Sequence, residues 1–340
     1  MASFCDSLGV DLHIPYSVVN IGVFPAFIST GMSSIYIYSP SGAVRDRAAF
    51  KRGLQHLRAQ GHDVQLDEGA LRSHQRFAGT DEERVAAIDR ASASQADVAL
   101  ISRGGYGLTR ILPKLNYKRI AKAIDRGTRF MGLSDFTAFQ TAVLAKTGAS
   151  TWAGPALGED FGAEVPDDIM QACFDDVLQG QGEGVGWRLS TATQKAYASR
   201  KPGTWARDGV LWGGNLAVLV SLLGTPYFPQ INRGVLFLED IAEHPYRIER
   251  MLTQLLHAGV LARQQAIVLG QFTQFQLTPH DKGFKFLSVV DWLRTQLKVP
   301  VLTDLPFGHV PTKVCLPVGA RVSLLVENRD ALILWPHDHG

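Results

Sequence analysis

The 340-residue chain contains only three cysteines, Cys5, Cys173 and Cys315, and none of them forms a Cys-x-x-Cys pair. This scarcity excludes a disulfide framework and a cysteine-rich zinc site. It is also typical of a reducing compartment. We therefore expect a cytoplasmic protein without a metal site.

The chain also lacks long apolar runs and a marked excess of either charge. No apolar stretch reaches the roughly 18 residues that span a bilayer, and the formal net charge is only +2. Neither nucleic acid nor an anionic membrane is expected as a partner. Hydrophobic residues make up 46% and charged residues 19% of the chain, as in a soluble globular protein. Its length exceeds what one core usually supports, so we expect two domains.

Residues 1–33 differ from the rest of the chain. Asp6 and Asp11 precede the apolar stretch 18–28, and no Lys or Arg does. A secretory signal has the opposite order of charges. The first predicted strand begins only at Ser34. We expect this extension to be disordered or to be an artefact of start-codon choice.

Strand-like and helix-like segments alternate through the next part of the chain. Thr80 and Glu83 form a capping box at the start of one predicted helix. The alternation predicts an α/β fold with a parallel, flavodoxin- or Rossmann-like sheet in an N-terminal domain over residues 34–160. Predicted strands cover 34–39, 63–66, 97–102 and 129–133, and predicted helices cover 43–60, 80–91 and 117–124.

Beyond Ala153 the pattern loosens. Residues 161–204 contain a helical pattern at 167–178 and glycine-rich or polar stretches, and we expect a linker region there. Residues 205–340 are predicted to form a smaller, strand-rich α/β domain. Its predicted strands lie at 209–212, 235–239, 266–270, 301–303, 321–327 and 331–335, and its helices near 216–223, 245–257 and 287–297.

Ser134 lies where an apolar run ends and a helical pattern begins. The run 129–133 predicts a buried strand, and the helical pattern starts at Asp135. Ser134 is therefore predicted to occupy a sharp turn at the carboxyl end of the sheet, as in a nucleophile elbow. The Gly-x-Ser-x-Gly sequence of that motif is absent. A serine that only caps the helix explains the same pattern.

The motif Arg103-Gly-Gly-Tyr-Gly107 follows the predicted strand 97–102. Three glycines in five residues allow backbone N–H groups to approach a ligand closely. The spacing matches neither Gly-x-Gly-x-x-Gly nor a P-loop, so no nucleotide cofactor is expected. In a parallel sheet this loop and Ser134 would share the carboxyl edge, where ligands bind. A tight turn without a ligand explains the glycines equally well.

A serine nucleophile needs a base, and the base needs an orienting acceptor. Of ten histidines, His309 differs because it follows a predicted strand in a loop bounded by proline and glycine. Glu239 and Asp240 end an apolar strand, where burial can orient one carboxylate. With Ser134, Glu239 and His309 give the chain order Ser–Glu–His. Taken singly, each of these residues also has a structural explanation.

In this combination the sequence resembles the LD-carboxypeptidases, serine peptidases that include murein tetrapeptide carboxypeptidases and microcin C immunity-type peptidases. The resemblance extends from Ser34 to Trp335. Ala153 precedes Gly-Pro where the family often has histidine, which bears on local substrate contacts and not on the triad. The matching blocks are 39–42, 78–84, 103–107 with Arg110 and 112–113, 132–135, 213–215, 238–240, 245–250, 308–309 and 316–319.

The resemblance implies that Ser134, Glu239 and His309 form a catalytic triad. It implies hydrolysis of an L-D peptide bond that releases D-alanine from murein tetrapeptide, by a homodimer acting in peptidoglycan recycling without a cofactor. The oxyanion hole would consist of backbone N–H groups of Asp135, Gly104 and Gly105. Candidate substrate-binding residues are Arg103, Tyr106, Trp212 and Asn215.

Alternatives remain open. Trp212 and Asn215 are equally explained as a core aromatic residue and a helix cap. An immunity-type peptidase would cleave an acyl- or aminoacyl-nucleotide conjugate, with Trp152 or Trp212 as the platform for the base. A protein of another class, a non-catalytic muropeptide binder, could share the fold, although a binder has no use for an acid–base pair.

Overall fold

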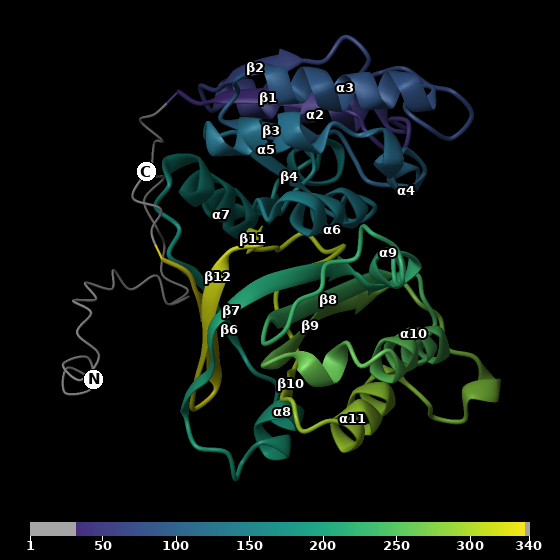
Figure 1. Ribbon diagram of the computed structural model, residues 1–340, viewed down its shortest axis with the longest axis vertical. Helices are drawn as coiled ribbons and strands as arrows, with labels where there is room; N and C mark the ends of the chain where they lie inside the picture. Colours follow the sequence, from purple (N-terminus) through teal and green to yellow (C-terminus); the bar gives the residue numbers. More distant parts are fainter. Residues whose placement is uncertain (1–31, 337–340) are drawn as a thin grey trace. The chain divides into compact units, whose positions relative to one another are not determined.

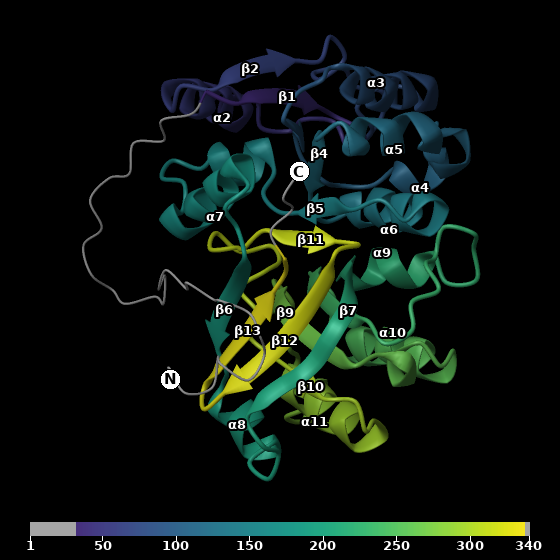
Figure 2. The ribbon, with the colours of Figure 1, turned by 60° about the vertical axis from the view of Figure 1, so that its left-hand side comes forward.

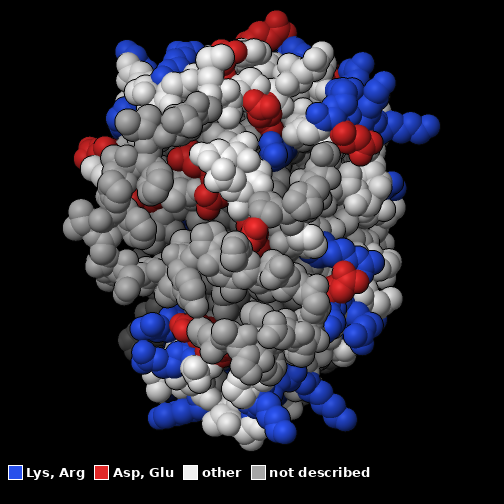
Figure 3. Space-filling view, turned by 90° about the vertical axis from the view of Figure 1, so that its left-hand side faces the viewer, with Lys and Arg blue, Asp and Glu red and all other residues white. Residues whose placement is uncertain are grey.

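The computed structural model describes residues 32–336 of the chain. The extension expected at residues 1–33 lies outside this range, except for its last two residues. None of the helices within 32–336 combines the length and the hydropathy that crossing a bilayer requires. Acidic and basic side chains both occur over the described part of the face in Figure 3.

The first sheet has six strands in the order β11-β5-β4-β3-β1-β2 (Figure 1). Five neighbouring strands are parallel, and only β11 runs antiparallel, at the edge beside β5. The expected parallel sheet is therefore confirmed, with one antiparallel edge strand that the sequence did not indicate. The strands are β1 (Ser34–Tyr38), β2 (Asp63–Leu66), β3 (Val98–Ile101), β4 (Arg129–Gly132), β5 (Thr151–Ala153) and β11 (Leu316–Val318).

Helices cover both faces of this sheet because its central strands carry apolar side chains on both sides. Within β1, Ile35 and Ile37 pack with α2 and α7, whereas Tyr36 and Tyr38 pack with α3, α5 and α6 on the other face. The sheet is therefore doubly wound. Its helices are α2 (Arg47–Ala59), α3 (Asp81–Ala93), α4 (Leu108–Ile111), α5 (Tyr117–Asp125), α6 (Phe136–Thr147) and α7 (Asp168–Gln179).

Local signals set the helix starts. The capping box of Thr80 and Glu83 is present at the start of α3, as the sequence predicts. α2 begins at Arg47 and not at residue 43. Asp46 caps its first turn by accepting from the N–H of Ala49, and the N–H of Ala43 instead donates to a loop carbonyl.

The second sheet has seven strands in the order β10-β9-β8-β7-β12-β13-β6 (Figure 2). The strands from β7 to β10 are parallel, and those from β7 to β6 through β12 and β13 are antiparallel. The strands are β6 (Gly184–Arg188), β7 (Gly203–Asn215), β8 (Val235–Ile241), β9 (Ala266–Thr273), β10 (Val301–Leu302), β12 (Arg321–Glu327) and β13 (Asp330–Leu334). The helices are α8 (Thr191–Ala196), α9 (Leu216–Ser221), α10 (Pro245–His257) and α11 (Phe286–Gln296).

Three parts of the chain do not follow the expected domain boundaries. α7 lies within residues 161–204 and packs against the first sheet. β6 and α8 lie within residues 161–204, where a linker is expected, and β6 is the edge strand of the second sheet. β11 comes from the C-terminal part of the chain and joins the first sheet through β5. The boundaries at 160 and 205 stay a prediction.

Short turns complete the fold and include one π-helical turn, Leu157–Phe161, after β5. In this turn Asp160 forms a buried ion pair with Lys313, which lies in the loop before β11. Both side chains are 3% exposed. Burial raises the pKa of Asp160 although Lys313 opposes the rise. The 3₁₀ turns are Leu112–Lys114, Leu261–Arg263 and Pro279–Asp281.

The substitution Lys313→Met should lower the free energy of unfolding by about 3–5 kcal/mol at pH 7, because it leaves a buried carboxylate unpaired. The loss should shrink as pH falls through the raised pKa of Asp160, since the neutral acid tolerates burial. Denaturant unfolding at several pH values measures both effects. Lys118→Met, on the exposed face of α5, is the matched control, and equal losses in the two variants would refute the role of the pair.

Candidate active site

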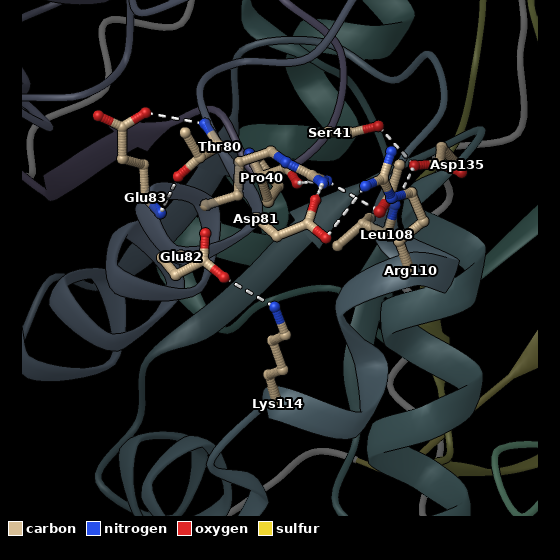
Figure 4. A network of polar contacts seen from close by, with 12 residues as sticks. Pro40, Ser41, Thr80, Asp81, Glu82, Glu83, Leu108, Arg110, Lys114 and Asp135 are labelled. Atoms are coloured by element: carbon tan, nitrogen blue, oxygen red, sulfur yellow. Dashed lines mark hydrogen bonds and ion pairs between the residues drawn. The ribbon is translucent and has the colours of Figure 1, made fainter. Parts of the chain in front are cut away.

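Three loops meet at the carboxyl edge of the first sheet, after β1, β3 and β4. The buried carboxylate of Asp135 joins them by accepting from the hydroxyl of Ser41 and, at 2.9 Å, from the N–H of Leu108 (Figure 4). Burial raises the pKa of Asp135, and these two hydrogen bonds oppose the rise. The Asp135 side chain therefore fixes the loops on either side of the candidate nucleophile.

The buried cation Arg84 binds two of these three loops, those after β1 and β3. Arg84 is fully buried, and its guanidinium donates to the carbonyl oxygens of Pro40 at 3.2 Å and Gly107 at 2.8 Å. Its ion-pair partner is Asp81, which also binds Arg110 (Figure 4). The block 78–84 thus has a structural function that the sequence alone does not reveal.

Ser134 lies in the turn between β4 and α6, as the sequence predicts. Its φ angle is +66°, a left-handed conformation that costs a non-glycine residue of the order of 1–3 kcal/mol. The alternative explanation, helix capping, does not hold, because Asp135 is the N-cap and no side-chain capping bond is present. Ser134 is half-buried, and the strain of its turn is typical of functional residues.

The glycine loop packs directly against Ser134. A Cβ atom on Gly104 would lie 2.6 Å from Ser134 Cβ and 2.8 Å from Ser134 Oγ. Within residues 32–336, the backbone N–H groups of Gly104, Gly105 and Asp135 have no hydrogen-bond acceptor. Unpaired donors beside a serine hydroxyl are the arrangement that an oxyanion hole requires.

Glu239 and His309 form a pair in the second sheet. Glu239 lies near the end of β8, is fully buried, and its Oε2 is 2.8 Å from His309 Nδ1. Gly308, at φ +137°, allows this approach, since a Cβ there would lie 3.2 Å from Glu239 Oε2. The loop is held to β9 because Gln271 donates to the carbonyls of Phe307 and Leu305.

The charge of Glu239 controls the ionisation of His309. Burial alone would lower the pKa of His309, but the hydrogen bond to Glu239 and its negative charge outweigh burial and raise it. Glu159 adds a smaller contribution in the same direction. Because Nδ1 binds the carboxylate, Nε2 is the nitrogen left to exchange protons with another group.

Asn215 connects this pair to the helix that begins after Ser134. Its backbone N–H donates to Thr137 Oγ1 at 2.9 Å. Its side-chain amide donates to Glu239 Oε1 at 3.2 Å and to Asp240 Oδ1 at 2.9 Å. A continuous set of contacts therefore runs from α6 to Glu239 and His309. Among the described residues, no hydrogen bond joins Ser134 directly to His309.

Asp240, which follows Glu239 in β8, is a second carboxylate at this site. Burial and the neighbouring charge of Glu239 raise the pKa of Asp240 to about 6. N–H groups of Ala217 and Ile241 donate to its carboxylate together with Asn215. The two adjacent carboxylates are tolerated because fixed donors surround them.

Two of the expected substrate contacts need correction. Trp212 is fully buried, and its indole N–H donates to Gln264 Oε1 at 3.0 Å, so it is a core residue of β7. Asn215 is 5% exposed, and its amide is occupied by Glu239, Asp240 and the N–H of Val218. It supports the site and does not offer donors to a peptide.

The other two candidates lie in the glycine loop. Tyr106 is 43% exposed and packs beside Phe77. Arg103 lies nearer the candidate nucleophile and pairs with Glu159 at 3.9 Å. Sequence reasoning missed Glu159, Thr137 and Arg84, because nothing in their local patterns indicates which distant loops they contact. No cluster of His, Cys, Asp and Glu side chains in the described part of the chain could hold a metal ion.

Two family models match the chain. The model of the LD-carboxypeptidase N-terminal domain matches residues 35–154, and that of the LD-carboxypeptidase C-terminal domain matches residues 208–324. Together with the fold and the Glu239–His309 pair, they define the chain as a hydrolase of the peptidase class. It belongs to the LD-carboxypeptidase family.

Individual relatives cover most of the chain. A Bacillus subtilis protein named "Probable murein peptide carboxypeptidase" is 30% identical over 82% of this chain and 84% of its own. The crystal structure of a muramoyltetrapeptide carboxypeptidase from Oxalobacter formigenes superposes with a TM-score of 0.79 at 37% identity, covering 90% of this chain and 99% of that one. The microcin C7 self-immunity protein of Escherichia coli is 26% identical over 87% of this chain and 90% of its own.

The imidazole of His309 should titrate above the ordinary histidine pKa of about 6.5. In Glu239→Gln the pKa should fall below that value, because burial then acts without the opposing charge. The pH dependence of the imidazole carbon-bound proton shifts in NMR spectra measures both pKa values, with His309→Asn used for assignment. Glu243→Gln should leave the His309 titration unchanged. The same midpoint in wild type and Glu239→Gln would contradict the assigned cause.

Proposed function

We propose that the protein is a serine carboxypeptidase that cleaves an L-D peptide bond and releases the terminal D-alanine of murein tetrapeptide. The observation that carries the proposal is the buried Glu239–His309 pair, linked through Asn215 to the helix that begins after Ser134. Such an arrangement can activate a serine hydroxyl. The names of the Bacillus and Oxalobacter relatives support this choice of substrate.

In the proposed reaction Ser134 Oγ attacks the carbonyl carbon of the scissile bond. His309 Nε2 accepts the hydroxyl proton and then donates it to the amine of the departing D-alanine. Glu239 holds the Nδ1–H tautomer and stabilises the imidazolium that forms. Water activated by His309 then hydrolyses the acyl-Ser134 ester and restores the hydroxyl.

The developing oxyanion would accept hydrogen bonds from the N–H of Asp135 and from that of Gly104 or Gly105. These donors lack acceptors within residues 32–336, so no existing bond has to break. Because Asp135 and Arg84 fix the loops that carry them, the donors are oriented before the substrate binds.

A second candidate function follows from the microcin immunity relative. Such an enzyme would cleave a nucleotide–peptide conjugate and would need an exposed aromatic platform for the base. Trp212 does not fit because it is fully buried, and Trp152 packs edge-on against Trp335 at 6.1 Å. We therefore favour the muropeptide. Release of D-alanine compared with cleavage of a nucleotide–peptide conjugate separates the two substrates.

The proposed setting is peptidoglycan recycling in the cytoplasm, by a homodimer. Buried Cys315 and half-buried Cys173, both free thiols, are compatible with a reducing compartment.

The remaining alternative, a non-catalytic muropeptide binder, would not need an oriented acid–base pair. Binding of the tetrapeptide without turnover would favour the binder.

Ser134→Ala and His309→Ala should each lower turnover of a tetrapeptide ending in D-alanine by about 10⁴- to 10⁶-fold. Release of D-alanine measures the rate, and circular dichroism shows whether each variant is folded. Ser199→Ala, in an exposed loop, should keep full activity. Full activity in Ser134→Ala would eliminate the proposal.

Gly104→Ala should lower kcat by about 10²- to 10³-fold, as expected when an oxyanion donor is displaced. The added methyl group would meet Ser134 Cβ at 2.6 Å and push the loop from the nucleophile. Gly182→Ala is the matched control because its nearest neighbour would lie at 3.7 Å. Steady-state kinetics together with Tm values test this. Unchanged kcat in a folded Gly104→Ala variant would place the oxyanion elsewhere.

A further inference from the structure

Arg103 occupies a space that the neighbouring glycines create. A Cβ on Gly42 would lie 2.3 Å from Arg103 Nη1, and a Cβ on Gly105 would lie 2.6 Å from it. Nη1 donates to the carbonyl of Gly104 at 3.2 Å, and Gly104 is the residue that packs against Ser134. The guanidinium therefore lies beside the loop that contacts the candidate nucleophile.

The positive charge of Arg103 has no close ionic partner in the described part of the chain. Its one ion pair is to Glu159, and that distance, 3.9 Å, is too long for a direct hydrogen bond. Arg103 is 16% exposed on its side chain, and burial lowers its pKa. The charges of Arg45 and Arg76 act in the same direction, whereas those of Glu159 and Asp135 oppose the shift. Arg103, Arg45 and Arg76 thus bring three positive charges against the two carboxylates of Glu159 and Asp135. This excess of one positive charge favours an incoming anion.

Glu159 is held near Arg103 by the π-helical turn Leu157–Phe161. The N–H of Gly158 donates to the carbonyl of Ser102 at 2.9 Å, and Ser102 precedes Arg103. Asp160 anchors the same turn through its ion pair with Lys313. The backbone is thus fixed at both sides, whereas the Glu159 side chain is 44% exposed. π-Helical turns of this kind frequently occur at functional sites.

We propose that Arg103 binds the free carboxylate of the departing D-amino acid, and that Glu159 is the counter-ion which this carboxylate replaces. The inference rests on the proposed function and names the group that would restrict cleavage to the end of a peptide. A guanidinium suits the task because its planar donors match both oxygens of a carboxylate. The long Arg103–Glu159 distance leaves these donors available.

The test compares a tetrapeptide ending in D-alanine with the same peptide ending in D-alanine amide. Wild type should prefer the free acid by about 10²-fold or more in kcat/KM, since a charged site rejects an analogue that leaves it unpaired. Arg103→Gln should lose this preference by losing activity on the acid alone. Arg103→Lys should restore part of it, and Arg119→Gln, on the exposed surface of α5, should keep all of it.

Glu159→Gln provides an independent readout. Removal of the competing counter-ion should lower KM for the acid and leave KM for the amide unchanged. It should also move the acidic limb of the pH–rate profile to lower pH, because Glu159 helps to raise the pKa of His309. A purely structural role of Glu159 would change both substrates equally.

Binding measurements separate this inference from the proposed function. Calorimetry with Ser134→Ala should show tighter binding of the acid than of the amide, and the difference should vanish in Ser134→Ala/Arg103→Gln. Equal binding or equal turnover of acid and amide by the parent proteins would overturn the role of Arg103 while Ser134-dependent hydrolysis stands. An acid-selective but inactive wild type would instead overturn the proposed function.

Discussion

Asn215 is the residue on which the arrangement of the candidate site depends. Its backbone N–H binds Thr137 on α6, and its side-chain amide binds Glu239 and Asp240 at the end of β8. Gly214 permits this close approach, since a Cβ there would lie 2.5 Å from Thr137 Oγ1. One buried residue thus sets the position of the acid–base pair relative to the helix that follows Ser134.

The buried charged residues around this contact hold loops in position, and their net contribution to the free energy of unfolding is small by comparison. A buried ion pair gains little over apolar packing, but removal of one partner is costly. Arg84 holds two loop carbonyls, and the Asp160–Lys313 pair joins the π-helical turn to the loop that follows His309. Asp135 joins three loop ends in the same way. The proposed mechanism needs such rigidity, because oxyanion donors act only if they are oriented in advance.

The features that the sequence predicted correctly are those that a short local pattern determines. The capping box of α3 and the strand–turn–helix at Ser134 depend on a few neighbouring residues, and both are present. The pairing of Glu239 with His309 was suggested by their positions after apolar strands and supported by the resemblance to a family, because 70 residues separate them in the chain and no local pattern links them. The partners of Asn215, the place of β11 and the π-helical turn depend on contacts between distant segments. The two explanations of Trp212, substrate contact and core residue, could not be separated because an apolar strand does not reveal that both of its faces are covered.

The central claim is that His309, oriented by Glu239, activates Ser134. Reaction of the folded protein with a fluorophosphonate, followed by mass-spectrometric mapping of the adduct, tests it most directly, because the reagent reports hydroxyl activation without any assumption about the natural substrate. The account predicts a single adduct on Ser134, formed rapidly in the wild type and far more slowly in His309→Ala and Asn215→Ala. An adduct on another serine, or a labelling rate independent of His309, would contradict it.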